Sequence, residues 1–216
     1  MKFHIITIFP GSFESYFNSS ILKNAKEKGL FEPIFYNLCD FSVKNTRRVD
    51  DRPYGGFPGT VISVEPLYKA IEFIEKKAGK SLKKIFLSPT GKIFNQKMVS
   101  KMVQKFDEII IICGHYEGID ARIFEIFQIE QISIGKYVIT SGELATMVFI
   151  DALVRYIPGV LSKDSLREES FSLGLSGKKE YPQYTRPEEF QNHKVPIELL
   201  SGNPKTIDEW KKKNLG

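Results

Sequence analysis

Residues 108–120 read EIIIICGHYEGID. The isoleucine run at 109–112 is typical of a strand buried on both faces, because β-branched residues suit extended backbone and leave no polar face. Gly114 ends the apolar run, and a polar turn follows. Strands of this kind occur where helices cover both sides of a parallel sheet. The stretch therefore indicates an α/β domain built around a buried, largely parallel sheet.

Segments with the pattern of strands and helices alternate on both sides of this stretch. Apolar, β-rich segments predict strands over residues 2–9, 31–38, 84–88 and 129–134, with a short extended piece over 137–140. Apolar residues at helical spacing predict helices over residues 12–28, 61–77, 95–105, 119–127 and 143–156. This order argues for helices on both faces of one largely parallel sheet.

The composition changes after residue 161. We expect a first domain over residues 1–161, a mobile polar linker over 162–183, and a short helical domain over 184–216. The helical pattern in the last part is clearest over residues 206–213.

Charge and cysteine content narrow the classes of function. The chain has 216 residues and a net charge of +5, from 31 Lys and Arg against 26 Asp and Glu, which permits a polyanionic partner. Its two cysteines make a disulfide framework improbable and favour a reducing compartment. Apolar runs such as residues 109–113 are far shorter than the roughly 20 residues of a membrane helix. We therefore expect a cytoplasmic protein with no membrane partner.

Three predicted strands end in glycine-containing turns, at residues 88–91, 114–120 and 135–142. Ligands of open parallel sheets collect at the carboxyl ends of the strands, and glycine allows a ligand to approach the backbone closely. Each turn alone would be an ordinary connection, but three together predict a binding site. No Walker A or GxGxxG pattern is present, and three scattered histidines give no zinc spacing.

A long loop over residues 40–59 is polar and basic, and then rich in glycine and proline. Arg47, Arg48, Arg52 and Tyr54 lie close together in it. Basic and aromatic side chains together suit phosphate contact and base stacking, so the loop is a candidate RNA-binding segment. The alternative is a solvated loop without a ligand.

Eight motifs that occur in a fixed order are more specific than the patterns above. The ordered series is VDDRPYGGFPG at 49–59, LSPxG at 87–91, CGxYEGID at 113–120, SIGxYV at 133–138, GEL at 142–144, RxIPGVL at 155–161, YTRP at 184–187 and LLSG at 199–202. This series, which covers nearly the whole chain, closely resembles the bacterial tRNA (guanine-N1)-methyltransferase family of the SPOUT superfamily.

The resemblance implies a trefoil knot in the C-terminal half of the α/β domain and a homodimer. It also implies methyl transfer from S-adenosylmethionine to N1 of the guanosine 3′ of the anticodon, position 37, in tRNA. The cofactor positions carried over are Leu87, Ser88, Pro89, Gly114, Tyr116, Glu117, Ile134, Gly135, Lys136, Tyr137, Val138, Ile139 and Gly142. The RNA-binding positions are Asp51, Arg52, Tyr54, Gly55 and Arg186.

This chemistry needs a general base, because guanine N1 carries a proton at neutral pH, and a cation near O6, where negative charge develops. By resemblance Arg155 supplies the cation, and Glu169 stands where the family usually has an aspartate base. The neighbouring Glu168 is a rival for that role. Family members also use Mg²⁺, and Glu117 matches the carboxylate connected with that dependence.

The chain departs from the family pattern at several positions. Phe57 and Ser141 replace glycines, and Lys136 replaces an aspartate. The sequence ends at Gly216, earlier than is usual, so we expect a shortened C-terminal domain. Two alternatives stay open at this stage. One is a related RNA methyltransferase with another target, and the other is a non-catalytic dimeric relative that binds RNA or cofactor.

Overall fold

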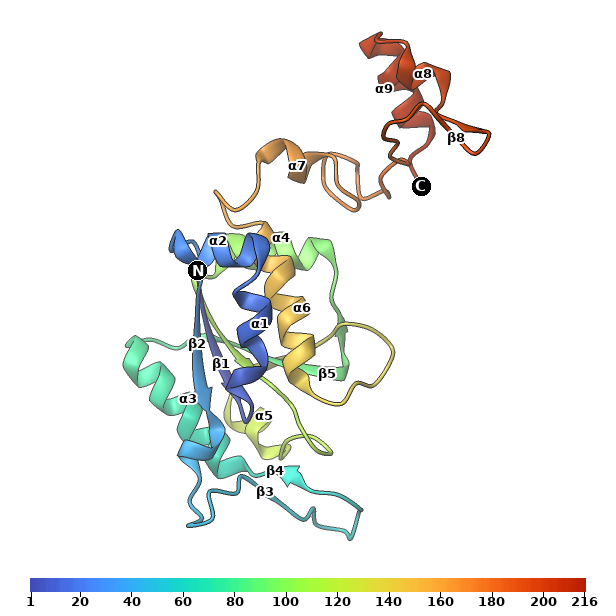
Figure 1. Ribbon diagram of the computed structural model, residues 1–216. Coiled ribbons are helices and arrows are strands. Elements are labelled where there is room, and N and C mark those ends of the chain that lie inside the picture. Colours follow the sequence, from blue (N-terminus) through green and yellow to red (C-terminus); the bar gives the residue numbers. More distant parts are fainter. The chain divides into compact units, whose positions relative to one another are not determined.

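The computed structural model describes residues 1–216, apart from the side chains of Lys163 and Asp164. The chain divides into two compact units, Met1–Val160 and Leu161–Gly216. The first unit contains a five-stranded sheet, ordered β2-β1-β6-β5-β7, in which all neighbouring strands are parallel (Figure 1). Its strands are β1 (Lys2–Thr7), β2 (Glu32–Asn37), β5 (Lys83–Ile93), β6 (Glu108–Ile112) and β7 (Ile129–Ser133). The predicted α/β class with a largely parallel sheet is confirmed.

The isoleucine run in β6 divides the core into two layers. Ile109 and Ile111 pack into one apolar cluster and Ile110 and Ile112 into the other, and all four are fully buried. This division follows from the strand period of two, which points successive side chains to opposite faces. The central strand therefore needs apolar residues at every position, as its sequence has.

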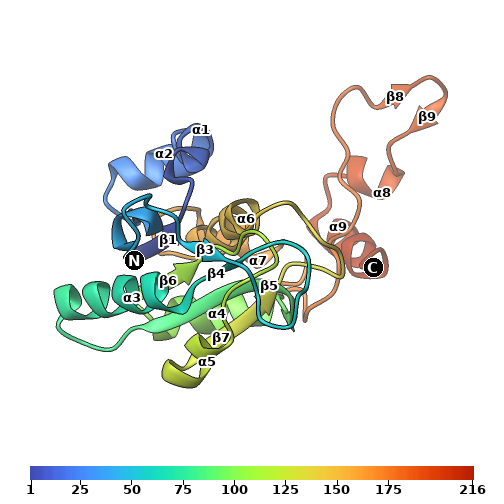
Figure 2. The same cartoon turned by 90° about the horizontal axis from the view of Figure 1, so that it is seen from below.

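Helices cover both faces of the sheet (Figure 2). One face carries α1 (Glu14–Phe17), α2 (Ser20–Glu27), α4 (Gln96–Lys105) and α6 (Gly142–Arg155), and the other carries α3 (Val64–Ala78) and α5 (Arg122–Ile126). Short 3-10 turns, η1 (Pro10–Phe13) and η2 (Leu38–Phe41), follow β1 and β2. A small antiparallel pair, β3 (Asp50–Asp51) and β4 (Val61–Ile62), brackets a glycine-rich loop.

Three predicted elements differ from the structure. The helix expected over residues 12–28 is interrupted between Phe17 and Ser20, and Ser20 has a positive φ of 48°. The helix expected over residues 61–77 starts only at Val64, because the two residues before Ser63 pair with β3 instead. The extended piece expected over 137–140 is not a strand.

Strand β5 is longer than predicted and is irregular at its end. Its register with β7 shifts between Leu87 and Lys92, so the segment between them bulges out of the sheet. Gly91 lies where a Cβ would come within 2.5 Å of the β7 backbone at Gln131 and Ile132, so only glycine fits this approach. The bulge places the LSPTG motif at the edge where the other strand ends meet.

The second unit contains α7 (Lys163–Arg167), the hairpin β8 (Glu189–Phe190) and β9 (His193–Lys194), α8 (Ile197–Leu200) and α9 (Pro204–Lys213). Trp210 of α9 is buried, and the rings of Tyr181 and Tyr184 pack edge-on against it. The sequence pattern located α9 but not the short hairpin. In the described part of the chain, no helix has both the length and the apolar character needed to cross a membrane.

The start of α4 depends on one side-chain cap. The Asn95 side-chain oxygen accepts a hydrogen bond from the backbone N–H of Met98 at 3.1 Å. We expect Asn95→Ala to lower the free energy of unfolding by about 1 kcal/mol, the usual value of such a cap. Urea denaturation measures the change. Asn95→Ser, which keeps a capping oxygen, should recover most of it, and equal losses in the two variants would contradict the cap.

Candidate functional site

A cavity of about 410 Å³ opens at the carboxyl edge of β5, β6 and β7. The three turns singled out in the sequence form its wall, joined by the first turn of α6. Residues at predicted cofactor positions that line it are Leu87, Ser88, Pro89, Gly114, Tyr116, Glu117, Ile134, Gly135, Tyr137, Val138, Ile139 and Gly142. A cavity of this size accepts a ligand as large as a nucleoside derivative.

Two close approaches of backbone shape the cavity. The N–H of Gly142 donates to the carbonyl of Gly114 at 2.7 Å, and a Cβ on Gly142 would lie 2.4 Å from the Gly114 nitrogen. A Cβ on Gly135 would lie 2.1 Å from the ring of Tyr137. Only glycine fits at Gly142, because the atoms that a Cβ would meet there belong to the backbone, so this part of the wall exposes backbone groups to a ligand.

The turn after β6 connects the cavity to the β3–β4 loop. Tyr116, which lines the cavity, has a positive φ of 57°, an uncommon conformation for a residue with a side chain. The N–H of Glu117 donates to the carbonyl of Thr60 at 3.0 Å. Gly59 lies so close to Glu117 that a Cβ there would be 2.6 Å from the Glu117 Cγ. The end of the glycine-rich loop is therefore packed on the rim of the cavity.

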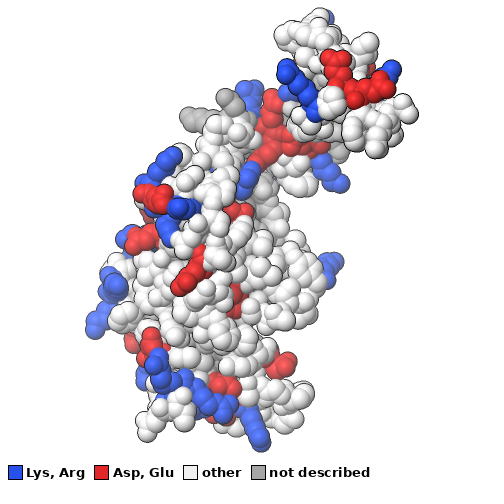
Figure 3. Space-filling model, viewed as in Figure 1, with Lys and Arg blue, Asp and Glu red and all other residues white. Residues whose placement is uncertain are grey.

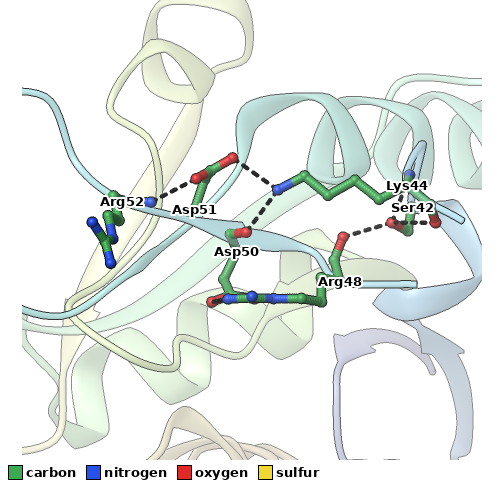
Figure 4. Close-up of polar contacts among 6 residues, drawn as sticks. All are labelled: Ser42, Lys44, Arg48, Asp50, Asp51 and Arg52. Carbon is green, nitrogen blue, oxygen red and sulfur yellow. Dashed lines mark hydrogen bonds and ion pairs between the residues drawn. The ribbon is translucent and has the colours of Figure 1, made fainter. Parts of the chain in front are cut away.

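Ion pairs stiffen the chain just before this loop (Figure 4). Lys44 contacts the carboxylate of Asp51 at 2.8 Å, and Arg48 contacts that of Asp50 at 3.0 Å. The hydrogen bond from Arg48 lowers the pKa of Asp50 even though burial opposes ionisation. The hydrogen bond from Lys44 likewise lowers the pKa of Asp51. Both carboxylates are thus held ionised and paired within the protein.

The tip of the loop presents aromatic and basic groups outward. Tyr54 is 97% exposed and Phe57 is 72% exposed. The guanidinium of Arg52 forms no ion pair with the described carboxylates and points away from Asp51 in Figure 4. Figure 3 shows Lys and Arg side chains gathered at the end of the first unit where β3 and β4 lie. The loop thus combines rigid anchoring at its base with exposed groups suited to a nucleic acid.

Arg155 lies at the end of α6 opposite to the cavity. Gly142, the first residue of this helix, lines the cavity, and Arg155 is its last residue (Figure 1). At 1.5 Å per residue the two are about 20 Å apart along the axis. Burial raises the pKa of Asp151, and the positive charge of Arg155 opposes this increase. Within the chain the structure does not bring Arg155 to the cavity.

The two candidate bases, Glu168 and Glu169, lie in the second unit and have different surroundings. Glu168 is engaged structurally, because its Oε2 accepts from the Tyr181 hydroxyl at 2.5 Å and from Lys211 at 2.8 Å. Those bonds lower the pKa of Glu168, the one from Lys211 most. Glu169 is half-buried beside it. Arg186 is exposed and precedes a cis proline.

Sequence reasoning did not identify every residue of the cavity wall. Gln131 comes from inside β7, Phe124 from α5, and Ala145 from the second turn of α6. None carries a local signal, because each reaches the cavity only through the packing of its element. Lys136, placed among the cofactor positions by its neighbours in the motif, is exposed and is not among the lining residues.

Comparison with known proteins gives a consistent answer. Residues 1–215 match the family model described as tRNA (Guanine-1)-methyltransferase TrmD. A tRNA (guanine-N(1)-)-methyltransferase of Clostridioides difficile is 47% identical over 98% of this chain and 91% of its own length. One of Carboxydothermus hydrogenoformans is 50% identical over 99% and 82%, respectively.

A solved structure agrees with the sequence relatives. The crystal structure of tRNA (m1G37) methyltransferase from Aquifex aeolicus matches with a TM-score of 0.79 and 38% identity, over 99% of this chain and 88% of that one. The family match spans residues 1–215 and so includes the turns that build the cavity. This protein belongs to the tRNA (guanine-N1)-methyltransferase family.

Proposed function

We propose that the protein transfers the methyl group of S-adenosylmethionine to N1 of guanosine 37 in tRNA, and that it is a tRNA (guanine-N1)-methyltransferase. The observation that carries this conclusion is the cavity at the strand ends, whose wall is made of the motifs of a family with this activity. The names of the two sequence relatives give methylation of guanine N1 in tRNA, and the name of the Aquifex aeolicus structure gives position 37. The non-catalytic alternative rests on the departures at Phe57, Lys136 and Glu169, and no residue singles out another RNA target.

The cavity suits S-adenosylmethionine in size and in the chemistry of its wall. Apolar side chains such as Leu87, Ile134 and Val138 would pack on the adenine and ribose. Backbone groups of Gly114 and Gly135, which line the cavity and carry no side chain of their own, would provide the hydrogen bonds. When bound, the cofactor supplies an electrophilic methyl group on a sulfonium.

Two residues of this chain would then act on the guanine. Glu169 would accept the proton of N1 as N1 attacks the methyl group, because protonated N1 has no free lone pair. Arg155 would stabilise the negative charge that develops on O6. Glu168 is paired with Lys211, and Glu169 is the residue that stands where the family usually has an aspartate base.

The β3–β4 loop would hold the anticodon region. Tyr54 offers a ring for stacking on an unpaired base, and Arg52 offers a cation for phosphate. Arg186 in the second unit would add a further phosphate contact. Asp51 and Gly55 would maintain the shape of the loop, because Asp51 is paired with Lys44 and Gly55 has a positive φ of 90°.

A homodimer would explain the position of Arg155. Leu144 and Val148 are 54% and 45% exposed on α6, an apolar surface that a second copy could cover. If two copies pack with their α6 helices antiparallel, the Arg155 end of one helix lies beside the cavity end of the other. The partner subunit would then complete each site.

Mg²⁺ is the least supported component. Among the residues whose placement is described, no three His, Cys, Asp or Glu side chains gather into a metal site. Glu117 lines the cavity as a single carboxylate. Mg²⁺ often binds through one carboxylate and keeps several waters, so it would complete its shell with water and RNA oxygens.

The trefoil knot and the division into a knotted domain, a mobile linker and a tRNA-binding domain remain proposals from the family resemblance. The linker contains α7 and a hydrogen-bonded turn in which the N–H of Phe171 donates to the carbonyl of Lys178 at 2.8 Å. A local fold of this size is small enough to rearrange on RNA binding.

Transfer of labelled methyl groups to tRNA transcripts tests the proposed function. A transcript with guanosine at position 37 should be labelled, and one with adenosine there should not. Labelling of both would favour another target. Calorimetric binding of S-adenosylmethionine without any labelling would favour a non-catalytic relative.

Replacing the exposed tyrosine tests the proposed RNA contact. We expect Tyr54→Ala to weaken tRNA binding by about tenfold, because base stacking is worth about 1–3 kcal/mol. Filter binding at constant salt measures the change, and calorimetry should show unchanged cofactor affinity. Tyr54→Phe, which keeps the ring, serves as the control. Equal weakening in both variants would contradict a stacking role.

A further inference from the structure

A buried carboxylate lies directly behind the cavity wall. Glu143 is the second residue of α6 and follows Gly142, which lines the cavity, but Glu143 itself is only 2% exposed. Burial of a carboxylate is costly unless it is hydrogen-bonded. The placement of such a group one residue from the ligand-binding wall indicates a role in shaping that wall.

A hydrogen bond connects the Glu143 side chain of α6 to the end of strand β1. The Thr7 hydroxyl at the end of β1 donates to Glu143 Oε1 at 2.5 Å, and Thr7 is 1% exposed. The N–H of Phe9 donates to the same hydroxyl at 2.9 Å, so the single hydroxyl proton is directed to the carboxylate. Among the described residues, Glu143 Oε2 has no hydrogen-bond partner. Thr7 is thus the side-chain donor on which this carboxylate depends.

The Thr7–Glu143 hydrogen bond lies beside the close backbone contact between Gly142 and Gly114 in the cavity wall. Strand β1 is paired on both sides, and the N–H of Cys113 donates to the carbonyl of Ile6 at 3.0 Å. Thr7 is therefore fixed relative to the end of β6, where Gly114 begins the next turn. Glu143 attaches α6 to this fixed point, beside the 2.7 Å bond between Gly142 and Gly114. Loss of the Thr7 bond would free the start of α6 from the sheet.

We propose that Glu143 is a positioning residue for cofactor binding, and that the Thr7–Glu143 hydrogen bond holds the first turn of α6 in the place that forms the cavity wall. This inference rests on the proposed function, because it assumes that S-adenosylmethionine occupies the cavity. It concerns the backbone of Gly142 and Gly114 rather than a direct contact of Glu143 with the ligand. Thr146 of α6 provides a matched control, because it is a second buried threonine. Its hydroxyl lies 3.2 Å from the Cys113 sulfur, and among the described residues it forms no hydrogen bond with Glu143.

Calorimetric titration with S-adenosylmethionine and S-adenosylhomocysteine tests the role directly. We expect Thr7→Val, which keeps the shape and removes the donor, to weaken both ligands by about tenfold, as loss of a hydrogen bond to a charged group does. Thr7→Ser should restore affinity. Thr146→Val should leave affinity unchanged, and unfolding midpoints recorded for all variants separate a general loss of stability from a loss of binding.

Three results would overturn the role. Unchanged ligand affinity in Thr7→Val would show that the bond does not shape the wall. Equal weakening in Thr146→Val would show a general response to buried substitutions. Weakening for the methyl donor alone would show that Glu143 acts by its charge on the sulfonium. If the unaltered protein binds neither ligand, the proposed function fails first, so the two failures are distinguishable.

Discussion

Glu169→Ala should lower methyl transfer to tRNA by about a hundredfold or more, the usual contribution of a positioned general base. The variant removes the proposed acceptor for the N1 proton. Cofactor binding should be unchanged, because the proposed role of Glu169 is toward the guanine and not toward the cofactor. Single-turnover transfer with saturating tRNA measures the rate, and calorimetry measures the affinity.

Glu168→Gln is the matched control for this experiment. It alters the neighbouring carboxylate, which is bound to Lys211 and Tyr181, and should reduce stability more than rate. Glu169→Asp, which shortens the side chain by one methylene and keeps the carboxylate, should retain much more activity than Glu169→Ala. A nearly normal rate in Glu169→Ala together with a large loss in Glu168→Gln would reverse the assignment.

Arg155→Ala should lower methyl transfer by about a hundredfold to a thousandfold, as removal of a group that stabilises developing negative charge does. Cofactor affinity should change little, because Arg155 is assigned to O6 of the guanine and is not among the residues that line the cavity. The rate is measured under single-turnover conditions, as for Glu169. Arg155→Lys should recover part of the loss, since it keeps the charge without the planar fork.

A loss of activity in Arg155→Ala could come from a disturbed α6 helix and not from the lost charge beside the guanine. Arg155 also opposes the raised pKa of the half-buried Asp151, so its loss could disturb α6. The double variant Asp151→Asn with Arg155→Ala removes both charges. If activity returns in the double variant, Arg155 acts through Asp151 and not on the guanine.

Mixed dimers test the proposed contribution of the partner subunit. A subunit with Arg155→Ala has an intact cavity, and a subunit with Gly142→Ala has an intact Arg155 but a blocked wall. If each site draws Arg155 from the partner, a dimer of the two variants retains one complete site and partial activity. An inactive mixed dimer would contradict that arrangement.

The sequence predicted the sheet well because its strands are unambiguous. The isoleucine run at 109–112 has no polar residue, so a strand made of it must be buried on both faces, as it is in the centre of the sheet. The helix over residues 12–28 was wrong at its centre because Phe13, Phe17 and Leu22 keep an almost helical spacing across the break, while Ser20 leaves the helical conformation. Val61 and Ile62 joined a strand because they pair with Asp51 and Asp50 earlier in the chain, which local spacing does not reveal.

The candidate site shows the same limit. The strand-end glycines predicted the position of the cavity, because glycine marks close approach of backbone. The distance of Arg155 from the cavity follows from the helix predicted over residues 143–156, which separates the turn at 135–142 from Arg155, although the family resemblance assigned both to one site. Glu143 was part of a recognised motif, but its bond to Thr7 spans 136 residues of sequence and became visible only in the structure.

The position of the methyl group on the product tests the central claim most directly. Transcript tRNA with guanosine at position 37 is incubated with the protein and S-adenosylmethionine, digested to nucleosides and short fragments, and analysed by mass spectrometry. We predict 1-methylguanosine in the fragment that contains position 37. A methyl group on another atom or another nucleotide, or an unmodified product while the cofactor is bound, would contradict the account.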